Sequence, residues 1–222
     1  MDYFVKLWKH QLDAIHRAAN LDEFALFFDP GLGKSATTIN LLRYKYLKHN
    51  KLLRTLILCP PIVIENWRRE FKAHSAVGDK VICLTGPGKK RAEVLKKNLA
   101  ESKIIVTNFE ALLMKEVFPL LLEYAPTCLV IDESQRIKSM QSKRTKAAIQ
   151  LADISKYRYI LSGTPVLNSP MDLFSQFRVL DKGATFGKNL FLFRAKYFYD
   201  RNALMPKNRY FPDWQIKPNA LE

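Results

Sequence analysis

The segment around which the chain is organised reads Phe28-Asp29-Pro30-Gly31-Leu32-Gly33-Lys34-Ser35. It follows a short apolar run at residues 24–27 and precedes residues 36–42, which have the pattern of a helix start. A strand, a glycine turn, Gly-Lys-Ser and a helix are the context of a phosphate-binding loop. The glycines let backbone N–H groups point at phosphate oxygens, and the helix N-terminus adds partial positive charge. The segment predicts a nucleotide site, with an ordinary loop and helix cap as the alternative.

Within this segment the basic and hydroxyl side chains have separate predicted tasks. Lys34 would reach the β- and γ-phosphates, and the Ser35 hydroxyl would ligate magnesium. The full pattern asks for glycine at position 28, where this chain has Phe28. The residues expected to surround the nucleotide phosphates are Pro30, Gly31, Leu32, Gly33, Lys34, Ser35 and Ala36.

Length and composition bound the class of protein. The chain has 222 residues and 48% hydrophobic residues, enough for one domain of good size with an appendage. No apolar run approaches the roughly 20 residues of a membrane span, and the first residues lack the apolar stretch of a secretory signal. Cys59, Cys83 and Cys128 are too widely spaced for a metal pair or disulfide framework. We therefore expect an intracellular protein of the cytoplasm, nucleoid or nucleus, with no membrane partner.

The net charge is strongly positive, at +15. Such an excess is typical of proteins that bind polyanions, although a basic surface that only aids solubility is the alternative. The positive residues are spread over Lys89-Lys90-Arg91, Lys96-Lys97, residues 136–146 and the C-terminal region. Spread charge favours a surface that follows a nucleic-acid backbone over a compact helix that reads sequence.

Short β-rich runs alternate with helical patterns along most of the chain. Strands are expected at 24–28, 55–59, 81–84, 104–107, 128–132 and 157–162, and helices near 35–47, 64–72, 90–99, 114–124, 143–152 and 171–180. This alternation predicts an α/β fold with a mostly parallel sheet and helices on both faces. In such sheets ligands bind beyond the carboxyl ends of the strands. We expect a nucleotide-binding lobe over residues 1–180.

The pattern changes after Leu180. Alternation stops, and proline, asparagine and aromatic residues become more frequent. We expect residues 181–222 to form a helical appendage followed by a loosely ordered tail.

A pair of carboxylates ends another apolar strand, in Leu129-Val130-Ile131-Asp132-Glu133. In a nucleotide hydrolase the first acid holds magnesium and the second acts on the attacking water. The alternative for the pair alone is an acidic helix N-cap. In a parallel sheet this pair and the glycine segment can open on the same edge, which favours nucleotide binding.

Three further patterns are weak when taken singly. Leu161-Ser162-Gly163-Thr164-Pro165 ends a strand and alone would be an ordinary turn. Cys59-Pro60-Pro61 followed by residues 66–71 would be a loop and an amphipathic helix with Trp67 in the core. Gln11 carries an amide that matches an adenine edge, but a lone glutamine is usually a surface residue.

Taken in order, these patterns resemble the first half of a helicase-superfamily-two motor, and within it the Swi/Snf-like branch of DNA-translocating ATPases. The resemblance covers about residues 7 to 180. It rests on Leu-x-x-His-Gln (7–11), Asp-Pro-Gly-Leu-Gly-Lys-Ser (29–35), Leu-Cys-Pro-Pro with Asn-Trp-Arg-Arg-Glu-Phe (58–61, 66–71), Thr-Asn-Phe-Glu-Ala-Leu (107–112), Asp-Glu-Ser-Gln-Arg-Ile-Lys (132–138) and Leu-Ser-Gly-Thr-Pro (161–165).

The resemblance implies a three-layer RecA-like P-loop lobe that uses ATP and Mg²⁺. Gln11 would sense adenine, and Lys34, Asp132 and Glu133 would be the catalytic residues, with Ser35 and Asp132 at the metal. It implies a coupling of nucleotide state to DNA grip through Gln135, Ser162 and Thr164. It also implies nucleic-acid contacts from Thr107, Asn108, Arg136 and Lys138.

This sequence departs from the resembling branch at several positions. Phe28-Asp29-Pro30 replaces the more usual Asp-Glu-Met. Gln135 stands where histidine is most frequent, and keeps donor and acceptor capacity but no titration near neutral pH. Leu167 stands where glutamine is common, which puts contacts of that loop in doubt.

The branch also uses a second RecA-like lobe, which closes over ATP and supplies arginines to the γ-phosphate. After Pro165 this chain has too few residues for such a lobe. We therefore expect a monomeric first motor lobe that acts on duplex DNA, binds ATP weakly alone and hydrolyses it very slowly. Two alternatives stay open: a non-enzymatic DNA-binding module with a nucleotide site as relic or switch, and a motor lobe of another branch, such as a restriction-type motor or an RNA helicase.

Overall fold

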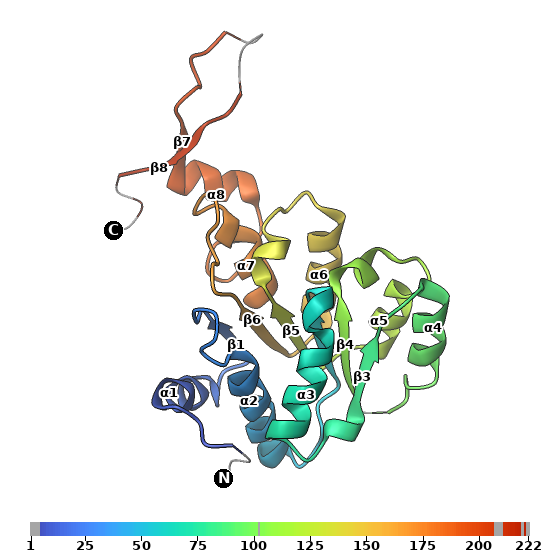
Figure 1. Ribbon diagram of the computed structural model, residues 1–222. Coiled ribbons are helices and arrows are strands. Elements are labelled where there is room, and N and C mark those ends of the chain that lie inside the picture. The colour runs from blue at the N-terminus through green and yellow to red at the C-terminus, as the bar shows by residue number, and fades with distance from the viewer. Residues whose placement is uncertain (1–4, 102, 207–210, 219, 221–222) are drawn as a thin grey trace.

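The computed structural model of the protein describes residues 5–101, 103–206, 211–218 and 220 (Figure 1). Its centre is a six-stranded sheet in which every pair of neighbouring strands is parallel. In spatial order the strands are β1 (Glu23–Leu26), β6 (Tyr157–Leu161), β5 (Cys128–Asp132), β2 (Thr55–Cys59), β4 (Ile104–Asn108) and β3 (Val81–Leu84).

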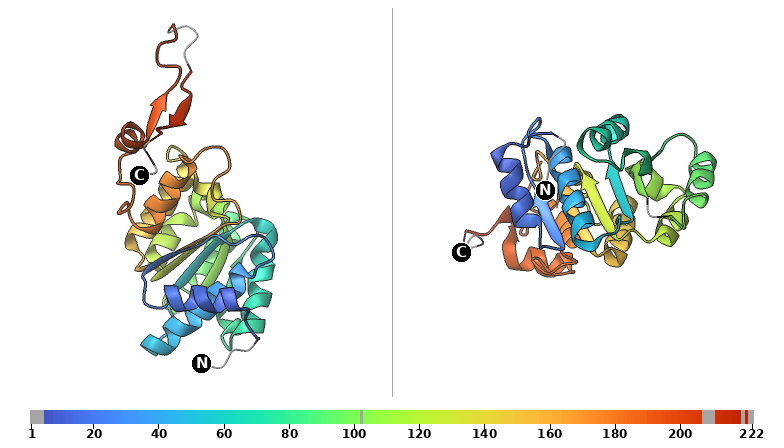
Figure 2. Two further views of the ribbon diagram at one scale, coloured as in Figure 1. Left: turned by 90° about the vertical axis from the view of Figure 1, so that its left-hand side faces the viewer. Right: turned by 90° about the horizontal axis from the view of Figure 1, so that it is seen from below.

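Helices cover both faces of this sheet (Figure 2). One face carries α1 (Lys9–Ala18), α2 (Lys34–His49) and α3 (Ile64–His74), and the other carries α5 (Phe118–Tyr124), α6 (Lys143–Ile154) and α7 (Asp172–Leu180). α4 (Gly88–Lys96) lies beside α5 at the β3 edge. Short 3-10 turns complete the layers: η1 (Pro61–Val63), η2 (Gly78–Lys80), η3 (Phe109–Leu113) and η4 (Ser134–Ile137).

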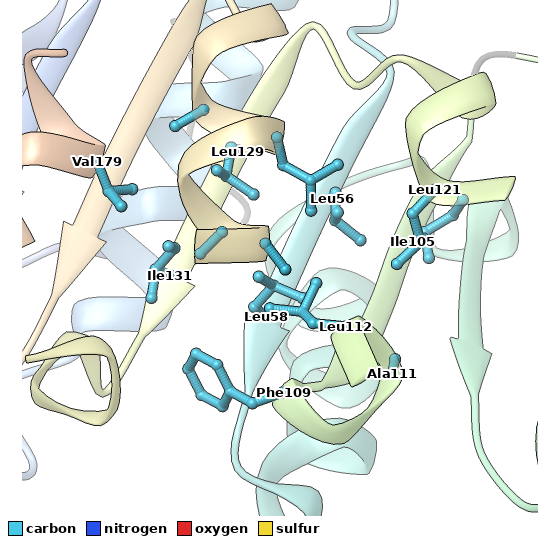
Figure 3. Close-up of a cluster of buried hydrophobic side chains, with 14 of the residues drawn as sticks. Leu56, Leu58, Ile105, Phe109, Ala111, Leu112, Leu121, Leu129, Ile131 and Val179 are labelled. Carbon is cyan, nitrogen blue, oxygen red and sulfur yellow. The ribbon is translucent and has the colours of Figure 1, made fainter. Parts of the chain in front are cut away.

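The core is divided by the sheet, because successive side chains of a strand point to opposite faces. In β2, Leu56 and Leu58 pack with α5, α6 and η3 (Figure 3), whereas Ile57 packs with α2 and α3. Strands buried on both faces need no polar alternation, which explains runs such as Leu129-Val130-Ile131. The expected three-layer α/β fold is confirmed, with a sheet that is wholly rather than mostly parallel.

Strand prediction was accurate where the apolar runs are short and sharply bounded. The strands expected at 55–59, 81–84 and 128–132 have those bounds, and the other three differ by one or two residues. The helix expected at 114–124 begins only at Phe118, with Pro119 in its first turn, and residues 115–117 form a turn after η3. The helix α1 before the glycine segment was not among the expected helices.

The C-terminal appendage contains two short strands that were not expected. α8 (Leu190–Tyr197) leads into a two-stranded antiparallel ribbon of β7 (Phe198–Asp200) and β8 (Trp214–Ile216), which projects from the body of the molecule (Figures 1 and 2). Phe174, Phe193 and Phe198 are buried together and fix α8 and the ribbon to α7. The expectation of a loosely ordered tail is therefore wrong for these strands. None of the helices in the described part of the chain has the length and apolar character to cross a membrane.

Candidate nucleotide and magnesium site

Three loops meet at the carboxyl edge of the sheet. The phosphate loop (residues 28–35) follows β1, the acidic loop (residues 132–135) ends β5, and the Ser-Gly-Thr-Pro loop (residues 162–165) follows β6. β6 lies between β1 and β5, so the Ser-Gly-Thr-Pro loop is flanked by the other two. The sheet order thus brings together the three patterns that the sequence places far apart.

The phosphate loop has the backbone that a phosphate cradle needs. Gly31 and Gly33 have φ values of 85° and 73°, in the left-handed region that favours glycine. The 16-residue helix α2 begins at Lys34, so its first N–H groups face the loop. The Lys34 ammonium donates to the Phe28 carbonyl at 3.0 Å, which keeps the amine at the loop. Phe28 therefore closes the loop through its backbone, which requires no glycine at that position.

Gln11 lies against the phosphate loop. Its amide nitrogen donates to the Leu32 carbonyl at 3.2 Å, and its amide oxygen accepts from the Trp8 backbone N–H at 2.9 Å. A Cβ at Gly33 would clash with the Gln11 amide nitrogen. The backbone angle therefore favours glycine at position 33, and a side chain there would displace the Gln11 amide. The adenine contact of Gln11 stays a prediction.

The acidic loop holds its first carboxylate in a nearly dry position. Asp132 is 8% exposed, and its Oδ2 accepts a hydrogen bond from the Trp67 indole N–H at 3.0 Å. Burial raises the pKa of Asp132 to about 6, with the neighbouring Glu133 acting in the same direction and Trp67 and Lys34 opposing it. A positive charge brought to this carboxylate would restore its ionised form.

Glu133 turns the chain sharply. Its φ of 56° is left-handed, a conformation that costs a non-glycine residue about 1–2 kcal/mol. Glu133 occupies the N-cap position of η4, but its side chain makes no capping hydrogen bond. The carboxylate instead accepts a hydrogen bond from the Gln135 amide at 2.6 Å. The helix-cap alternative therefore does not account for the carboxylate pair.

A chain of hydrogen bonds links the acidic loop to the Ser-Gly-Thr-Pro loop. The Gln135 amide oxygen accepts from the Ser162 hydroxyl at 2.8 Å, and the Ser162 oxygen accepts from the Thr164 backbone N–H at 3.0 Å. The phosphate loop is in contact as well, because a Cβ at Gly163 would lie 3.0 Å from Cδ of Pro30. The three residues expected to couple the loops are thus in one continuous network.

The expected nucleic-acid residues are placed differently from one another. Thr107 and Asn108 are buried at the end of β4, where Arg91 donates to both side chains at 3.3 and 2.6 Å. Arg136 is exposed, and Lys138 pairs with Asp172 at 3.5 Å. Neither Thr107 nor Asn108 offers a free side chain to a phosphate here, so a direct contact from them stays a prediction. Basic side chains line a depression around η4, namely those of Arg136, Lys138, Lys143 and Arg144.

Comparison with known proteins agrees with this geometry. A family model described as "SNF2-related domain" matches residues 14–201. The chain belongs to the SNF2-related family. The resemblance to a Swi/Snf-like motor lobe is thereby confirmed. A solved structure described as the Sulfolobus solfataricus SWI2/SNF2 ATPase core in complex with dsDNA is similar with a TM-score of 0.75 and 28% identity, over 88% of this chain and 39% of that one.

Curated relatives of this SNF2-related chain are much longer proteins. The TATA-binding protein-associated factor MOT1 of Saccharomyces cerevisiae is 30% identical over 212 residues, which is 89% of this chain and 11% of that protein. The chromodomain-helicase-DNA-binding protein 1-like of Danio rerio is 35% identical over 150 residues, or 65% of this chain and 14% of that protein. The SNF2-related chain thus spans a small fraction of each of these relatives.

Sequence reasoning missed two buried polar residues of this SNF2-related domain. The Ser134 hydroxyl donates to the Gln176 amide oxygen at 2.6 Å, and both side chains are fully buried. The carboxylate of Asp172 accepts from the backbone N–H groups of Leu167 and Asn168, each at 3.0 Å. Leu167 is therefore held by its backbone, although its side chain is not the expected glutamine. A polar residue on the apolar side of the expected helix 171–180 was the available signal for Gln176.

Proposed function

We propose that this chain is the ATP- and Mg²⁺-binding first motor lobe of an ATP-dependent translocase that acts on duplex DNA. The observation that carries the proposal is the meeting of three loops on neighbouring strands, in which the acidic loop is hydrogen-bonded to the Ser-Gly-Thr-Pro loop and the phosphate loop packs against the latter. An acidic N-cap or an isolated turn would not require these three loops to be joined. The basic composition supports a polyanionic partner.

The residues at the site fit Mg²⁺ that is bound together with a nucleotide. Ser35 and Asp132 supply oxygen ligands, which this hard cation prefers. Within the described residues there is no group of three or more His, Cys, Asp or Glu side chains that could form a protein cage. Mg²⁺ usually takes one or two protein ligands and completes its shell with water and phosphates. When bound, the ion would neutralise charge on the transferred phosphoryl group.

The side chains themselves suggest how the lobe works. Backbone N–H groups of the phosphate loop and the Lys34 ammonium would hold the β- and γ-phosphates, and Lys34 would exchange the Phe28 carbonyl for them. Glu133 would accept a proton from the attacking water, and this carboxylate is already oriented by Gln135. Through Gln135 and Ser162, a change at the γ-phosphate would reach the Ser-Gly-Thr-Pro loop.

We further propose that hydrolysis needs a second RecA-like lobe with an arginine at the γ-phosphate, a group worth about a thousandfold or more in rate. The protein would act as a monomer inside the cell, in the cytoplasm, nucleoid or nucleus. Gripping the phosphates without reading bases suits a motor that moves along any sequence.

The test begins with titration of a fluorescent ATP analogue and Mg²⁺ into the chain, into Lys34→Ala and into Asp132→Asn. We expect weak binding that Lys34→Ala abolishes, and a Mg²⁺ dependence that Asp132→Asn removes. Equal binding by wild type and Lys34→Ala would favour a relic site. Robust DNA-stimulated turnover by the 222 residues alone would contradict the need for a second lobe. Stimulation by RNA instead of duplex DNA in a two-lobed protein would favour another branch.

A further inference from the structure

Gln176 is completely buried on α7 and connects the acidic loop to the Ser-Gly-Thr-Pro loop. Its amide oxygen accepts from Ser134, the residue after Glu133, at 2.6 Å. Its amide nitrogen donates to the carbonyl of Pro165 at 2.7 Å and to the carbonyl of Asp172 at 2.8 Å. One side chain therefore satisfies a group from the acidic loop and a group from the Ser-Gly-Thr-Pro loop.

This connection is a second path beside the one through Gln135. Gln135 is half-buried and reaches Glu133 and Ser162 by side chains near the site. The Ser134–Gln176 hydrogen bond is fully buried, and a buried polar group that loses its partner is costly. Loss of this buried bond is therefore expected to cost more than loss of the half-buried bonds of Gln135.

The same helix also anchors the appendage. Phe174, two residues before Gln176 on α7, packs against Phe193 of α8 with ring centroids 4.8 Å apart. At the start of α7, the Asp172 carboxylate holds residues 167 and 168 and pairs with Lys138. A displacement of α7 would move both loops and the root of the appendage together.

We infer that Gln176 is a positioning residue that holds the acidic loop and the Ser-Gly-Thr-Pro loop against α7. Nucleotide binding then changes the positions of both loops and of α7 together. This inference rests on the proposed function, because it concerns the same site. Gln176 itself touches no nucleotide, and its effect passes through Ser134 and Pro165.

Two serines offer a matched pair of variants for the test. Ser134→Ala removes the hydroxyl that Gln176 accepts from. Ser175→Ala removes an equally buried hydroxyl on α7, next to Gln176, and no hydrogen-bond partner of this hydroxyl is found within the described residues. Gln176→Leu removes both ends of the connection at similar volume. Ser134→Ala/Gln176→Leu removes the hydroxyl that Gln176→Leu alone would leave unpaired.

The first measurement is amide hydrogen exchange of the nucleotide-free chain, which needs no activity. We expect Gln176→Leu to speed exchange in residues 133–136 and 162–168 by about tenfold, without loss of protection in the sheet. Ser134→Ala should act in the same direction, and Ser175→Ala should match wild type. Unchanged exchange in Gln176→Leu, or equal acceleration in Ser175→Ala, would overturn the inference.

The second measurement separates positioning from packing. Duplex DNA affinity is compared with and without a saturating non-hydrolysable ATP analogue. We expect Gln176→Leu to lose the nucleotide-dependent change in DNA affinity and to keep its nucleotide affinity. The double variant should regain part of the thermal stability but not the coupling, since the Ser134 hydroxyl is no longer left unpaired while the Pro165 carbonyl still lacks its donor. Recovery of coupling with stability would show a packing role and overturn the inference.

Failure of the proposed function would look different. In that case wild type and Lys34→Ala would bind the ATP analogue equally. The exchange result for Gln176→Leu would then still decide whether the two loops are locked to α7, because that measurement is made without nucleotide.

Discussion

The indole N–H of Trp67 donates a hydrogen bond to Oδ2 of Asp132 at 3.0 Å, across 65 residues of sequence and within the core. α3 supplies the donor and β5 the acceptor, so the expected magnesium acid is aimed by a helix on one face of the sheet. Carboxylates that bind metals are commonly held by such outer partners, and the loss of one typically costs about 10–100-fold in metal affinity. Trp67 therefore packs in the core and also fixes the orientation of the Asp132 carboxylate.

Replacing Trp67 by phenylalanine should weaken Mg²⁺-dependent nucleotide binding by about tenfold, because the ring remains and the N–H is lost. The measurement is a titration of the ATP analogue at increasing Mg²⁺. Phe71→Leu is the control, since Phe71 is a buried aromatic neighbour with its ring centroid 6.2 Å from that of Trp67. An equal loss in both variants would mean that packing, not the hydrogen bond, matters.

Asp132→Asn should make the nucleotide-free fold more stable while it removes the metal site. The folded state raises the pKa of Asp132 from 3.8 to about 6, so it binds the proton more tightly than the unfolded chain does. On account of this group, stability is highest below pH 4 and falls as the pH rises to about 6. At about 1.4 kcal/mol per pKa unit, the cost at pH 7.5 is roughly 3 kcal/mol at most.

Urea unfolding of both proteins at several pH values checks this expectation. The asparagine variant should be more stable than wild type by roughly 1–3 kcal/mol at pH 7.5, and the difference should disappear near pH 4. The Trp67 N–H keeps an acceptor, because the asparagine carbonyl replaces the carboxylate oxygen. A variant that is less stable at pH 7.5 would show that the ionised Asp132 is not destabilising.

The meeting of the three loops was largely predictable because their patterns are local, whereas the nucleotide and magnesium roles of their residues stay predictions. Each loop has a local sequence pattern that predicts its backbone: glycines before Lys34, carboxylates at the end of an apolar strand, and the turn at Ser162. In a parallel sheet the carboxyl ends of the strands lie at the same edge, so these loops come close together. α1 was also visible in principle, since Leu12, Ala14, Ile15 and Ala18 recur at helical spacing on its buried face.

Other features depend on partners that no local pattern contains. Gln176 becomes informative only when Ser134 and Pro165 are known to lie beside it. The strands β7 and β8 have three residues each and are separated by a long connection, so no two-residue turn signal marks them. Arg91 is similar, because its charge suggested a surface whereas its side chain is buried.

Gly163→Ala should disturb the phosphate loop from the neighbouring strand. The added methyl would lie 3.0 Å from Cδ of Pro30 and 3.5 Å from the Phe28 carbonyl, and a proline ring cannot rotate away. Because Pro30 is exposed, the phosphate loop must shift by a few tenths of an ångström to make room, at a smaller cost than overpacking of a core. We expect weaker ATP-analogue binding together with a lower unfolding midpoint. Gly31→Ala is the contrast, since no atom lies within 4 Å of its added Cβ and only backbone strain is introduced. Wild-type affinity in Gly163→Ala would show that the loops move independently.

The salt dependence of DNA binding should distinguish the role of Arg136 from that of Arg91. Arg136 is exposed, so Arg136→Ala should remove one phosphate contact and lower the slope of log affinity against log salt by about 0.9.

Arg91 is buried and donates to the Gly86 carbonyl at 2.7 Å as well as to Thr107 and Asn108. Lysine cannot reproduce this fork of donors. Arg91→Lys should therefore weaken DNA binding by distorting the end of β4 while the slope stays at its wild-type value. The measurement is fluorescence anisotropy with a labelled duplex over a range of salt concentrations. A reduced slope in Arg91→Lys would instead place Arg91 on a phosphate.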